Sequence, residues 1–121
     1  MARVLIVDDS PSQLMGMKLI IERLGHETLT AEDGALGVEA AKRELPDLIL
    51  MDVVMPNLNG FQATRSISKN AETAHIPIIL VPTKDKETDR VWGIRQGAKA
   101  YLTKPVNEAA LIKLVKELLP S

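Results

Sequence analysis

A chain of 121 residues, 45% hydrophobic and 26% charged, predicts one globular domain over residues 1–121 and argues against disorder. Fifteen basic residues nearly balance sixteen acidic ones, and the net charge of −1 gives no reason to expect nucleic acid or an anionic membrane surface as a partner. The absence of cysteine excludes disulfides, thiolate metal sites and a cysteine nucleophile.

Five short apolar segments alternate with helical patterns along the chain. Arg3–Val7 and Leu48–Met51 contain continuous apolar runs rather than alternating ones, as a strand covered by helices on both faces requires. The remaining expected strands are Glu27–Thr30, Ile76–Val81 and Ala100–Leu102.

Between these segments the apolar spacing changes to a helical period near 3.6 residues. Ser10 is placed to cap the first helix and Asp33 the second, while Gly60–Lys69 and Glu87–Arg95 predict the third and fourth. The fifth helix begins after Asn107, and its apolar stripe is typical of a core-facing helix. That stripe consists of Leu111, Leu114, Val115, Leu118 and Leu119.

Five consecutive strand–helix units predict an α/β fold, an open parallel sheet with helices on both faces. In such doubly wound sheets, ligands bind beyond the carboxyl ends of the strands, where the strand order reverses. The polar residues placed there are Asp8, Asp9, Ser10, Asp52, Thr83, Thr103 and Lys104.

Three of these carboxylates converge if the first and third strands are neighbours. Asp8, Asp9 and Asp52 would then repel one another, so a cation or raised pKa values must offset their charge. Magnesium is usually held by one or two carboxylates together with phosphate oxygens, and Lys104 would add positive charge. Singly, each aspartate would be interpreted as a turn former or cap and the lysine as a solvated charge. Their joint placement is what favours a functional site.

Two chemistries fit this cluster. Asp52 could be a nucleophile that forms an aspartyl phosphate beside magnesium, or all three acids could form a simple metal site. Lys104 favours the first hypothesis, because a dianionic phosphoryl group gains from a nearby ammonium and a bare metal site does not.

Four motifs carry a resemblance over essentially the whole chain: Val7-Asp8-Asp9-Ser10, Leu50 to Pro56, Asn59-Gly60 and Thr103-Lys104-Pro105. Together they resemble the response-regulator receiver family, the CheY-like proteins. The resemblance implies a flavodoxin-like, doubly wound sheet of five parallel strands in the order 2-1-3-4-5.

The resemblance also implies a role for each residue of the acidic cluster. Asp52 would be the phosphoacceptor. Asp9 and Asp52 would ligate Mg²⁺ directly, together with the backbone carbonyl of Val54, while Asp8 would act through water. Lys104 would pair with the phosphoryl oxygens.

Three further roles follow from the resemblance. The Lys104–Pro105 bond would be cis, a proline phenomenon. Tyr101 occupies the position of the family's rotating aromatic switch, although alone it would be interpreted as a half-buried residue at the sheet edge. The backbone N–H of Thr83 would bind the phosphoryl group.

One position departs from the family pattern. Receivers usually have serine or threonine at the end of the fourth strand, where its hydroxyl binds the phosphoryl group, but here Pro82 offers neither a hydroxyl nor an N–H. We expect weakened coupling between phosphorylation and shape. The alternatives are that Thr83 takes over, although strand alternation directs its side chain to the other face, or that Pro82 is an introduced substitution.

Segments 59–65 and 84–97 are similar, more narrowly, to stand-alone receivers of chemotaxis-like systems that control type IV pili and twitching motility. The expected donor of the phosphoryl group is a CheA-like histidine kinase. We expect the protein to be a monomer that signals by contacting a motor or pilus protein with the surface near its fourth helix. Trp92 on that helix is interpreted equally well as a packing residue or a partner anchor. A phosphate sink without a downstream target is an alternative.

The apolar run at Val4–Val7 is too short for a signal peptide core, and no apolar stretch approaches the roughly 20 residues that span a bilayer. We therefore expect a cytoplasmic protein without membrane insertion.

Three rival functions remain from other classes. A magnesium-dependent phosphatase with an aspartyl-phosphate intermediate would need a D-x-D motif and a cap domain, and we expect no enzyme beyond self-catalysed phosphorylation and dephosphorylation. A flavodoxin-like electron carrier would have to place its FMN phosphate against Asp8 and Asp9, which repel it. An interaction module with a vestigial site is compatible with Pro82.

Overall fold

A computed structural model of the chain describes residues 1–119. Five parallel strands form one sheet in the order β2-β1-β3-β4-β5, which confirms the predicted fold class and strand order. The strands are β1 (Arg3–Val7), β2 (Glu27–Ala31), β3 (Leu48–Met51), β4 (Ile78–Leu80) and β5 (Ala100–Tyr101). The helices are α1 (Pro11–Arg23), α2 (Gly34–Glu44), α3 (Gly60–Lys69), α4 (Glu87–Arg95) and α5 (Glu108–Leu118).

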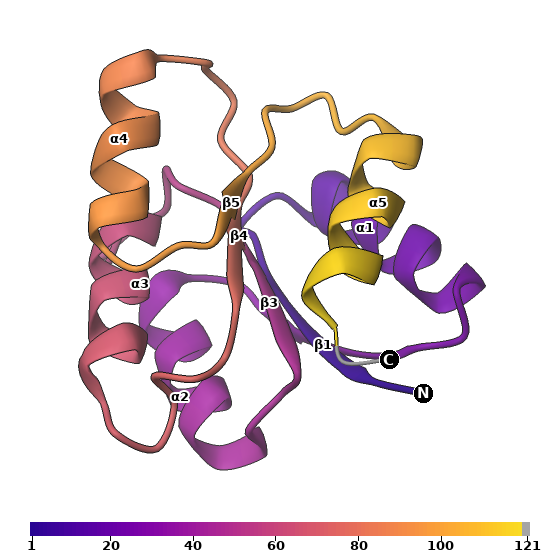
Figure 1. The fold of residues 1–121 in the computed structure, drawn as a ribbon, viewed down its shortest axis with the longest axis horizontal. Helices are drawn as coiled ribbons and strands as arrows, with labels where there is room; N and C mark the ends of the chain where they lie inside the picture. The colour runs from indigo at the N-terminus through magenta and orange to yellow at the C-terminus, as the bar shows by residue number, and fades with distance from the viewer. Residues whose placement is uncertain (120–121) are drawn as a thin grey trace.

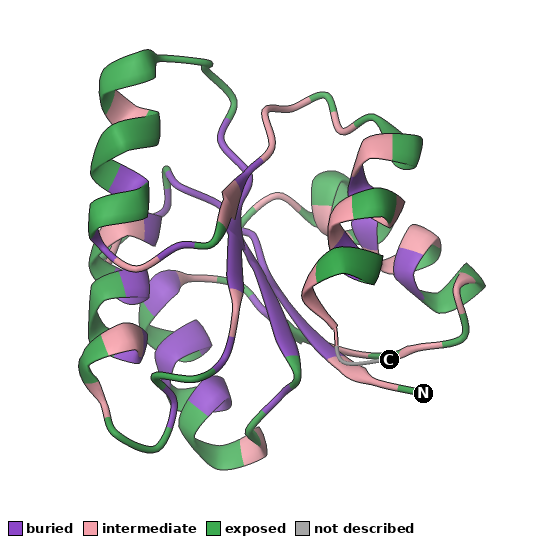
Figure 2. Ribbon diagram, in the orientation of Figure 1, coloured by how far each residue is buried: buried purple, intermediate pink, exposed green. Residues whose placement is uncertain are grey.

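The sheet lies between two helical layers, with α1 and α5 on one face and α2, α3 and α4 on the other (Figure 1). Consequently β3 and β4 are buried along their whole length and β1 after its first residue, as Figure 2 shows. Alternate residues of the continuous apolar runs therefore enter two separate cores, Leu5 on the α2–α3 side and Ile6 on the α1–α5 side. Within residues 1–119 no helix is both long and apolar enough to cross a bilayer.

Polar side chains cap three of the helices, and two of these caps, Asp33 of α2 and Asn107 of α5, are the residues that the sequence predicts. The Asp33 carboxylate accepts a hydrogen bond from the backbone N–H of Leu36 at 2.8 Å, and Asn107 caps α5 in the same way. Asn59 forms a reciprocal capping box with Gln62 at the start of α3. Ser10 occupies the expected cap position of α1, but its side chain accepts no capping hydrogen bond.

The two strands at the far side of the sheet are shorter than the sequence predicts. β4 begins at Ile78 rather than Ile76, since Pro77 has no N–H to contribute, although its carbonyl still accepts a bond from the N–H of Ile49 at 3.0 Å. β5 has two residues, and Leu102 continues the ladder by donating to the Leu80 carbonyl at 2.8 Å. Backbone hydrogen bonds therefore continue past the last residues of β5, and they keep the segment that follows this strand aligned with its neighbour β4.

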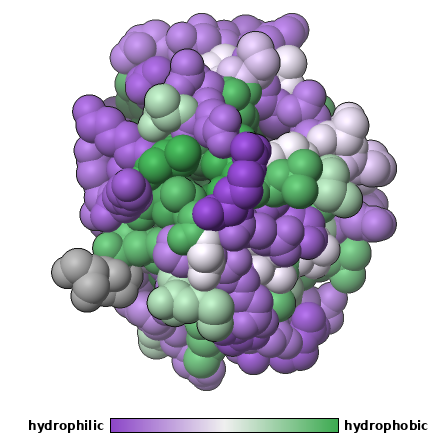
Figure 3. All heavy atoms as spheres, turned by 90° about the vertical axis from the view of Figure 1, so that its right-hand side faces the viewer, coloured by the Kyte–Doolittle hydropathy of each residue, from purple (hydrophilic) through white to green (hydrophobic). Residues whose placement is uncertain are grey.

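The face formed by α1 and α5 leaves apolar side chains partly uncovered among polar ones (Figure 3). A shallow groove of about 260 Å³ lies on this side of the molecule. It is lined by Ser12, Gln13, Gly16, Met17, Ile20 and Val106.

Candidate functional site

Backbone hydrogen bonds bring the two buried aspartates to adjacent strand ends. The N–H of Asp52 donates to the Val7 carbonyl at 2.9 Å, and the N–H of Asp8 donates to the Ala31 carbonyl at 3.1 Å. Since β1 pairs in parallel with both β2 and β3, residues that follow these strands must emerge at the same sheet edge. Asp8 and Asp52 are nearly fully buried there, at 1% and 5% exposure.

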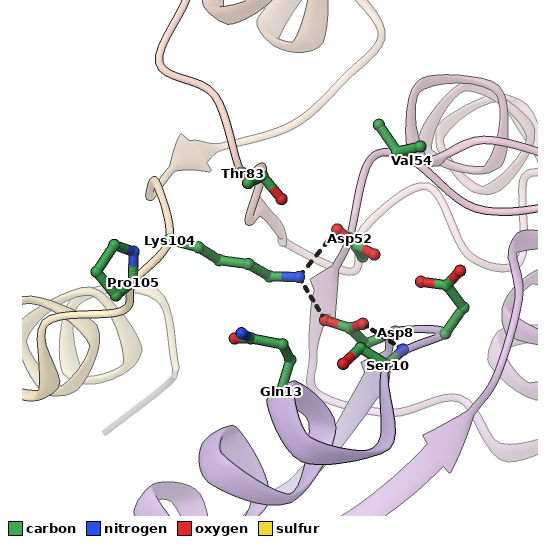
Figure 4. Close-up of a pocket in the computed structure, with 9 residues that line it drawn as sticks. Asp8, Ser10, Gln13, Asp52, Val54, Thr83, Lys104 and Pro105 are labelled. Atoms are coloured by element: carbon green, nitrogen blue, oxygen red, sulfur yellow. Dashed lines mark hydrogen bonds and ion pairs between the residues drawn. The ribbon is translucent and has the colours of Figure 1, made fainter.

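Lys104 reaches this edge from the other side of the sheet. Its backbone N–H donates to the Pro82 carbonyl at 2.7 Å, which ties the segment after β5 to the segment after β4. The ammonium donates to Asp8 Oδ2 at 2.8 Å and to Asp52 Oδ1 at 3.1 Å (Figure 4). The three charged residues that the sequence places after separate strands therefore form one cluster.

Burial raises the pKa of Asp52 to about 6, and the negative charge of Asp8 acts in the same direction. The charge and hydrogen bond of Lys104 and the N–H of Val53 oppose the rise without cancelling it. For Lys104, burial acts to lower the pKa, but the hydrogen bond to Asp8 and the charge of Asp52 outweigh it, so its pKa lies above the usual value. The lysine is thus a permanent cation at neutral pH, while the site still carries an excess of negative charge.

This excess fits a divalent cation. One carboxylate oxygen each from Asp8, Asp9 and Asp52 lies within 4.8 Å of the others, so a single ion could contact all three residues. Carboxylate oxygens are the ligands that magnesium prefers, and Asp9, which is exposed, leaves the site open to solvent. The side chain of Val54 is 78% exposed at the rim.

A glycine, Gly60, holds the loop between β3 and α3 close to the backbone of Asp52. The N–H of Gly60 donates to the Val53 carbonyl at 2.8 Å, and a Cβ at Gly60 would collide with the backbone carbonyl of Asp52. Asn57 in this loop adopts a left-handed conformation with φ of 69°. These two backbone constraints set the course of the loop that starts at Asp52.

Above the cluster opens a pocket of about 510 Å³. It contains every phosphoryl-binding and metal side chain that the sequence predicts, and in addition Gln13, which sequence reasoning missed. The available signal was positional: Gln13 lies in the first turn of the helix that begins directly after Asp8 and Asp9.

The structure changes the interpretation of the segment after β4. Pro82 is buried and Thr83 is exposed, and the Thr83 side chain lines the pocket (Figure 4). The expectation that Thr83 would point to the opposite face is wrong, because β4 ends at Leu80 and strict alternation holds only within a strand.

Tyr101 is more deeply buried than an edge aromatic, at 7% exposure. The Arg90 guanidinium lies 5.1 Å from the centre of its ring, a cation–π arrangement, and its hydroxyl is buried without a hydrogen-bond partner among residues 1–119. The Lys104–Pro105 peptide bond is cis. Trp92 is 49% exposed on α4.

The doubly wound sheet, with an acidic cluster and a lysine at the carboxyl edge of its strands, has the arrangement that the resemblance to receiver domains implies. Residues 4–116 match the response regulator receiver domain, and the chain belongs to that family. Members of the family accept phosphoryl groups from histidine kinases and bind magnesium in an acidic pocket.

The chain is 57% identical to protein PilH of Pseudomonas aeruginosa strain PAO1 over 119 residues, which cover 98% of each chain. It is 37% identical to the response regulator PleD of Caulobacter vibrioides over 117 residues, but spans only 26% of that longer protein.

Two solved structures show the same fold. The chemotaxis protein CheY4 of Vibrio cholerae has a TM-score of 0.92 at 31% identity, with 98% of this chain and 99% of that chain covered. The receiver domain of the sensor histidine kinase PA1611 of P. aeruginosa PAO1, which has a magnesium ion coordinated in its active-site cleft, has a TM-score of 0.91 at 30% identity, with 99% and 98% covered.

Proposed function

We propose that this chain is a single-domain response regulator that accepts a phosphoryl group on Asp52 from a CheA-like histidine kinase, in a magnesium-dependent reaction. The observation that carries the proposal is the Lys104 ammonium, which lies within hydrogen-bond distance of both Asp8 and Asp52. The 57% identity to PilH, over 98% of both chains, supports a function in a chemotaxis-like system that controls type IV pilus motility.

The transfer needs a carboxylate nucleophile and stabilisation of charge on the phosphoryl group. A carboxylate oxygen of Asp52 forms a bond to phosphorus as the bond from phosphorus to the donor's imidazole nitrogen breaks, and the electron pair of that bond leaves with the imidazole. Lys104 balances charge on the phosphoryl oxygens. Magnesium, held by Asp9 and Asp52 with the Val54 carbonyl and through water by Asp8, would supply further charge stabilisation and orient the group.

The test is incubation with magnesium and acetyl phosphate, followed by intact-mass measurement. The wild type should gain one phosphate, Asp52→Asn should gain none, and Asp85→Asn, which removes an exposed carboxylate on the segment after β4, should behave as the wild type. Phosphate retained by Asp52→Asn would refute the assignment. Repeated turnover of a small phosphate ester such as p-nitrophenyl phosphate would favour the phosphatase alternative.

A specific observation favours weak coupling of this reaction to output. Pro82 is buried where receivers usually carry a hydroxyl, so the inward pull on the segment after β4 has no side-chain hydroxyl at that position. Thr83 lines the pocket and could offer its N–H or hydroxyl to the phosphoryl group instead. A weakly coupled receiver would suit a phosphate sink that drains the kinase.

Amide hydrogen exchange around Tyr101, with and without the phosphoryl mimic beryllium trifluoride, tests this coupling. We expect a small change in protection in the wild type and a larger one in Pro82→Thr. A large change in the wild type would contradict weak coupling.

The remaining parts of the proposal concern setting and partners. We place the reaction in the cytoplasm, with a monomer that signals by protein contacts and binds no nucleic acid. The exposed Val91, Trp92 and Ile94 on α4 support a protein contact at that helix, with a pilus or motor component as the partner in the PilH-like case. Trp92 fluorescence during titration with a candidate partner would test the contact.

A further inference from the structure

We propose that Gln13 sets the lifetime of the phosphorylated state by orienting the water that hydrolyses the aspartyl phosphate. The inference rests on the proposed phosphorylation of Asp52 and assigns a role in hydrolysis to a further residue of the pocket. Gln13 lies in the first turn of α1, and its side chain extends toward Lys104 in the pocket above the two buried aspartates (Figure 4).

The other side chains of the pocket are committed or unsuited to this task. The Lys104 ammonium contacts Asp8 and Asp52, and Asp9 belongs to the carboxylate cluster that fits magnesium. Val54 and Pro105 have no polar side-chain atoms. The remaining free polar groups are those of Ser10, Gln13 and Thr83.

Among these three, Gln13 has the reach and the chemistry. The Ser10 hydroxyl lies 3.3 Å from the Ser12 hydroxyl, a local contact on the α1 side. Thr83, on the segment after β4, has a short side chain with a single hydroxyl group. Gln13 is exposed, makes no side-chain hydrogen bond within residues 1–119, and carries an acceptor and donors at the end of a long side chain.

The pocket is wide enough to admit water, so a residue of the pocket can act on the orientation of the attacking water molecule. The pocket volume of about 510 Å³ exceeds many times the roughly 30 Å³ that one water molecule occupies in the liquid. In hydrolysis, the water oxygen forms a bond to phosphorus while the bond from phosphorus to the Asp52 oxygen breaks. The carboxylate recovers its electron pair, and the water proton passes to the departing phosphate.

The Gln13 amide assists this step in the way that a glutamine positions the attacking water in several nucleotide hydrolases. Its carbonyl oxygen accepts a hydrogen bond from the attacking water, a contact that is made only when water approaches phosphorus. Loss of one neutral hydrogen bond at the transition state corresponds to a roughly threefold to tenfold slower reaction.

The experiment measures loss of phosphate after the donor is removed. The wild type, Gln13→Leu and Glu39→Leu are phosphorylated with magnesium and acetyl phosphate, desalted into magnesium buffer, and followed by intact mass over time. Gln13→Leu should lose its phosphate roughly three to ten times more slowly than the wild type. Glu39→Leu, which introduces the same apolar side chain at an exposed position of α2 outside the pocket lining, should decay at the wild-type rate.

A second measurement separates this role from a structural one. Beryllium trifluoride occupies the phosphoryl position but has no bond for water to cleave, so Gln13→Leu and the wild type should bind it with equal affinity in calorimetry. Weaker binding in Gln13→Leu would show that Gln13 only shapes the pocket and would overturn the inference. Equal or faster phosphate loss in Gln13→Leu would overturn it as well.

Failure of the proposed function has a different signature. If the wild type gains no phosphate on Asp52, the assignment of Asp52 fails and the inference falls with it. If the wild type is phosphorylated normally but the three proteins decay alike, only the role of Gln13 fails. Because purified protein and a small donor are used, a role of Gln13 at the neighbouring α1–α5 groove in partner contact does not affect the result.

Discussion

Replacing Asp52 by asparagine should stabilise the magnesium-free protein at neutral pH, although it removes the proposed phosphoacceptor. The folded chain surrounds this carboxylate with apolar strand ends and a second buried carboxylate, Asp8, and Lys104 compensates only part of the cost. Asparagine keeps a carbonyl oxygen for the N–H of Val53, which donates to Asp52 Oδ1 at 2.9 Å. It carries no charge that must be desolvated.

The magnitude follows from the pKa of Asp52. In the folded protein the carboxyl holds its proton up to about pH 6, whereas its ordinary value is 3.8. Between these values the folded state binds more protons than the unfolded state, so stability falls as pH rises through this window. At pH 7.5 the loss amounts to about 3 kcal/mol, and because the attraction of Lys104 already contributes to the pKa of Asp52, Asp52→Asn should recover most of this loss, a gain of roughly 2–3 kcal/mol.

Urea unfolding in EDTA at pH 4.5 and pH 7.5 measures the difference. Asp52→Asn should be more stable than the wild type by roughly 2–3 kcal/mol at pH 7.5 and by about 1 kcal/mol at pH 4.5, where the folded carboxyl keeps its proton but the unfolded one has largely lost it. Millimolar magnesium should narrow or reverse the difference at pH 7.5, because the cation binds the folded wild type and the variant lacks one ligand. An Asp52→Asn protein that is less stable in EDTA, or a difference independent of pH, would refute this account of the site.

Urea unfolding of four single variants tests other parts of the structure. Lys104→Met should cost about 3 kcal/mol at pH 7.5, because it leaves two buried carboxylates without a cation, and an unchanged midpoint would contradict the contacts of Lys104 with Asp8 and Asp52. Gly93→Ala should lower the free energy of unfolding by about 1–3 kcal/mol, since its Cβ would lie 2.5 Å from Leu80 Cδ1. Gly16→Ala, in the interior of α1 with nothing within 4 Å of its Cβ, should raise it by about 0.5–1 kcal/mol. Changes of equal sign in the two variants would be inconsistent with this packing. Tyr101→Phe should add about 1 kcal/mol by removing a buried hydroxyl without a partner, and a loss of stability would indicate that the hydroxyl is satisfied.

Local sequence patterns predicted most of the fold because their causes are local. The continuous apolar runs at Arg3–Val7 and Leu48–Met51 are the strands as observed, and the two helices predicted at Gly60–Lys69 and Glu87–Arg95 have the bounds that the structure shows. The short strand β4 was predicted less well. Its limits depend on hydrogen bonds to the neighbouring strands, and Pro77 breaks the pattern that the apolar run suggests.

The candidate site divides in the same way. Asp8, Asp9, Asp52 and Lys104 could be predicted because each directly follows a recognisable strand, and parallel strands end at one edge of the sheet. The side chains of Thr83 and Gln13 could not be placed in the pocket, since they lie outside strands, where alternation no longer specifies direction.

The amino-acid sequence alone determined the succession of strands and helices along the chain, the edge of the sheet at which the aspartates lie, and the family to which the chain belongs. These depend on apolar periodicity and on residues adjacent to strand ends. Only the tertiary structure decided that the Lys104 ammonium lies between Asp8 and Asp52, that burial raises the pKa of Asp52, and that Gln13 lines the pocket. Such distances and desolvation arise from packing between segments far apart in the chain, and no local pattern encodes them.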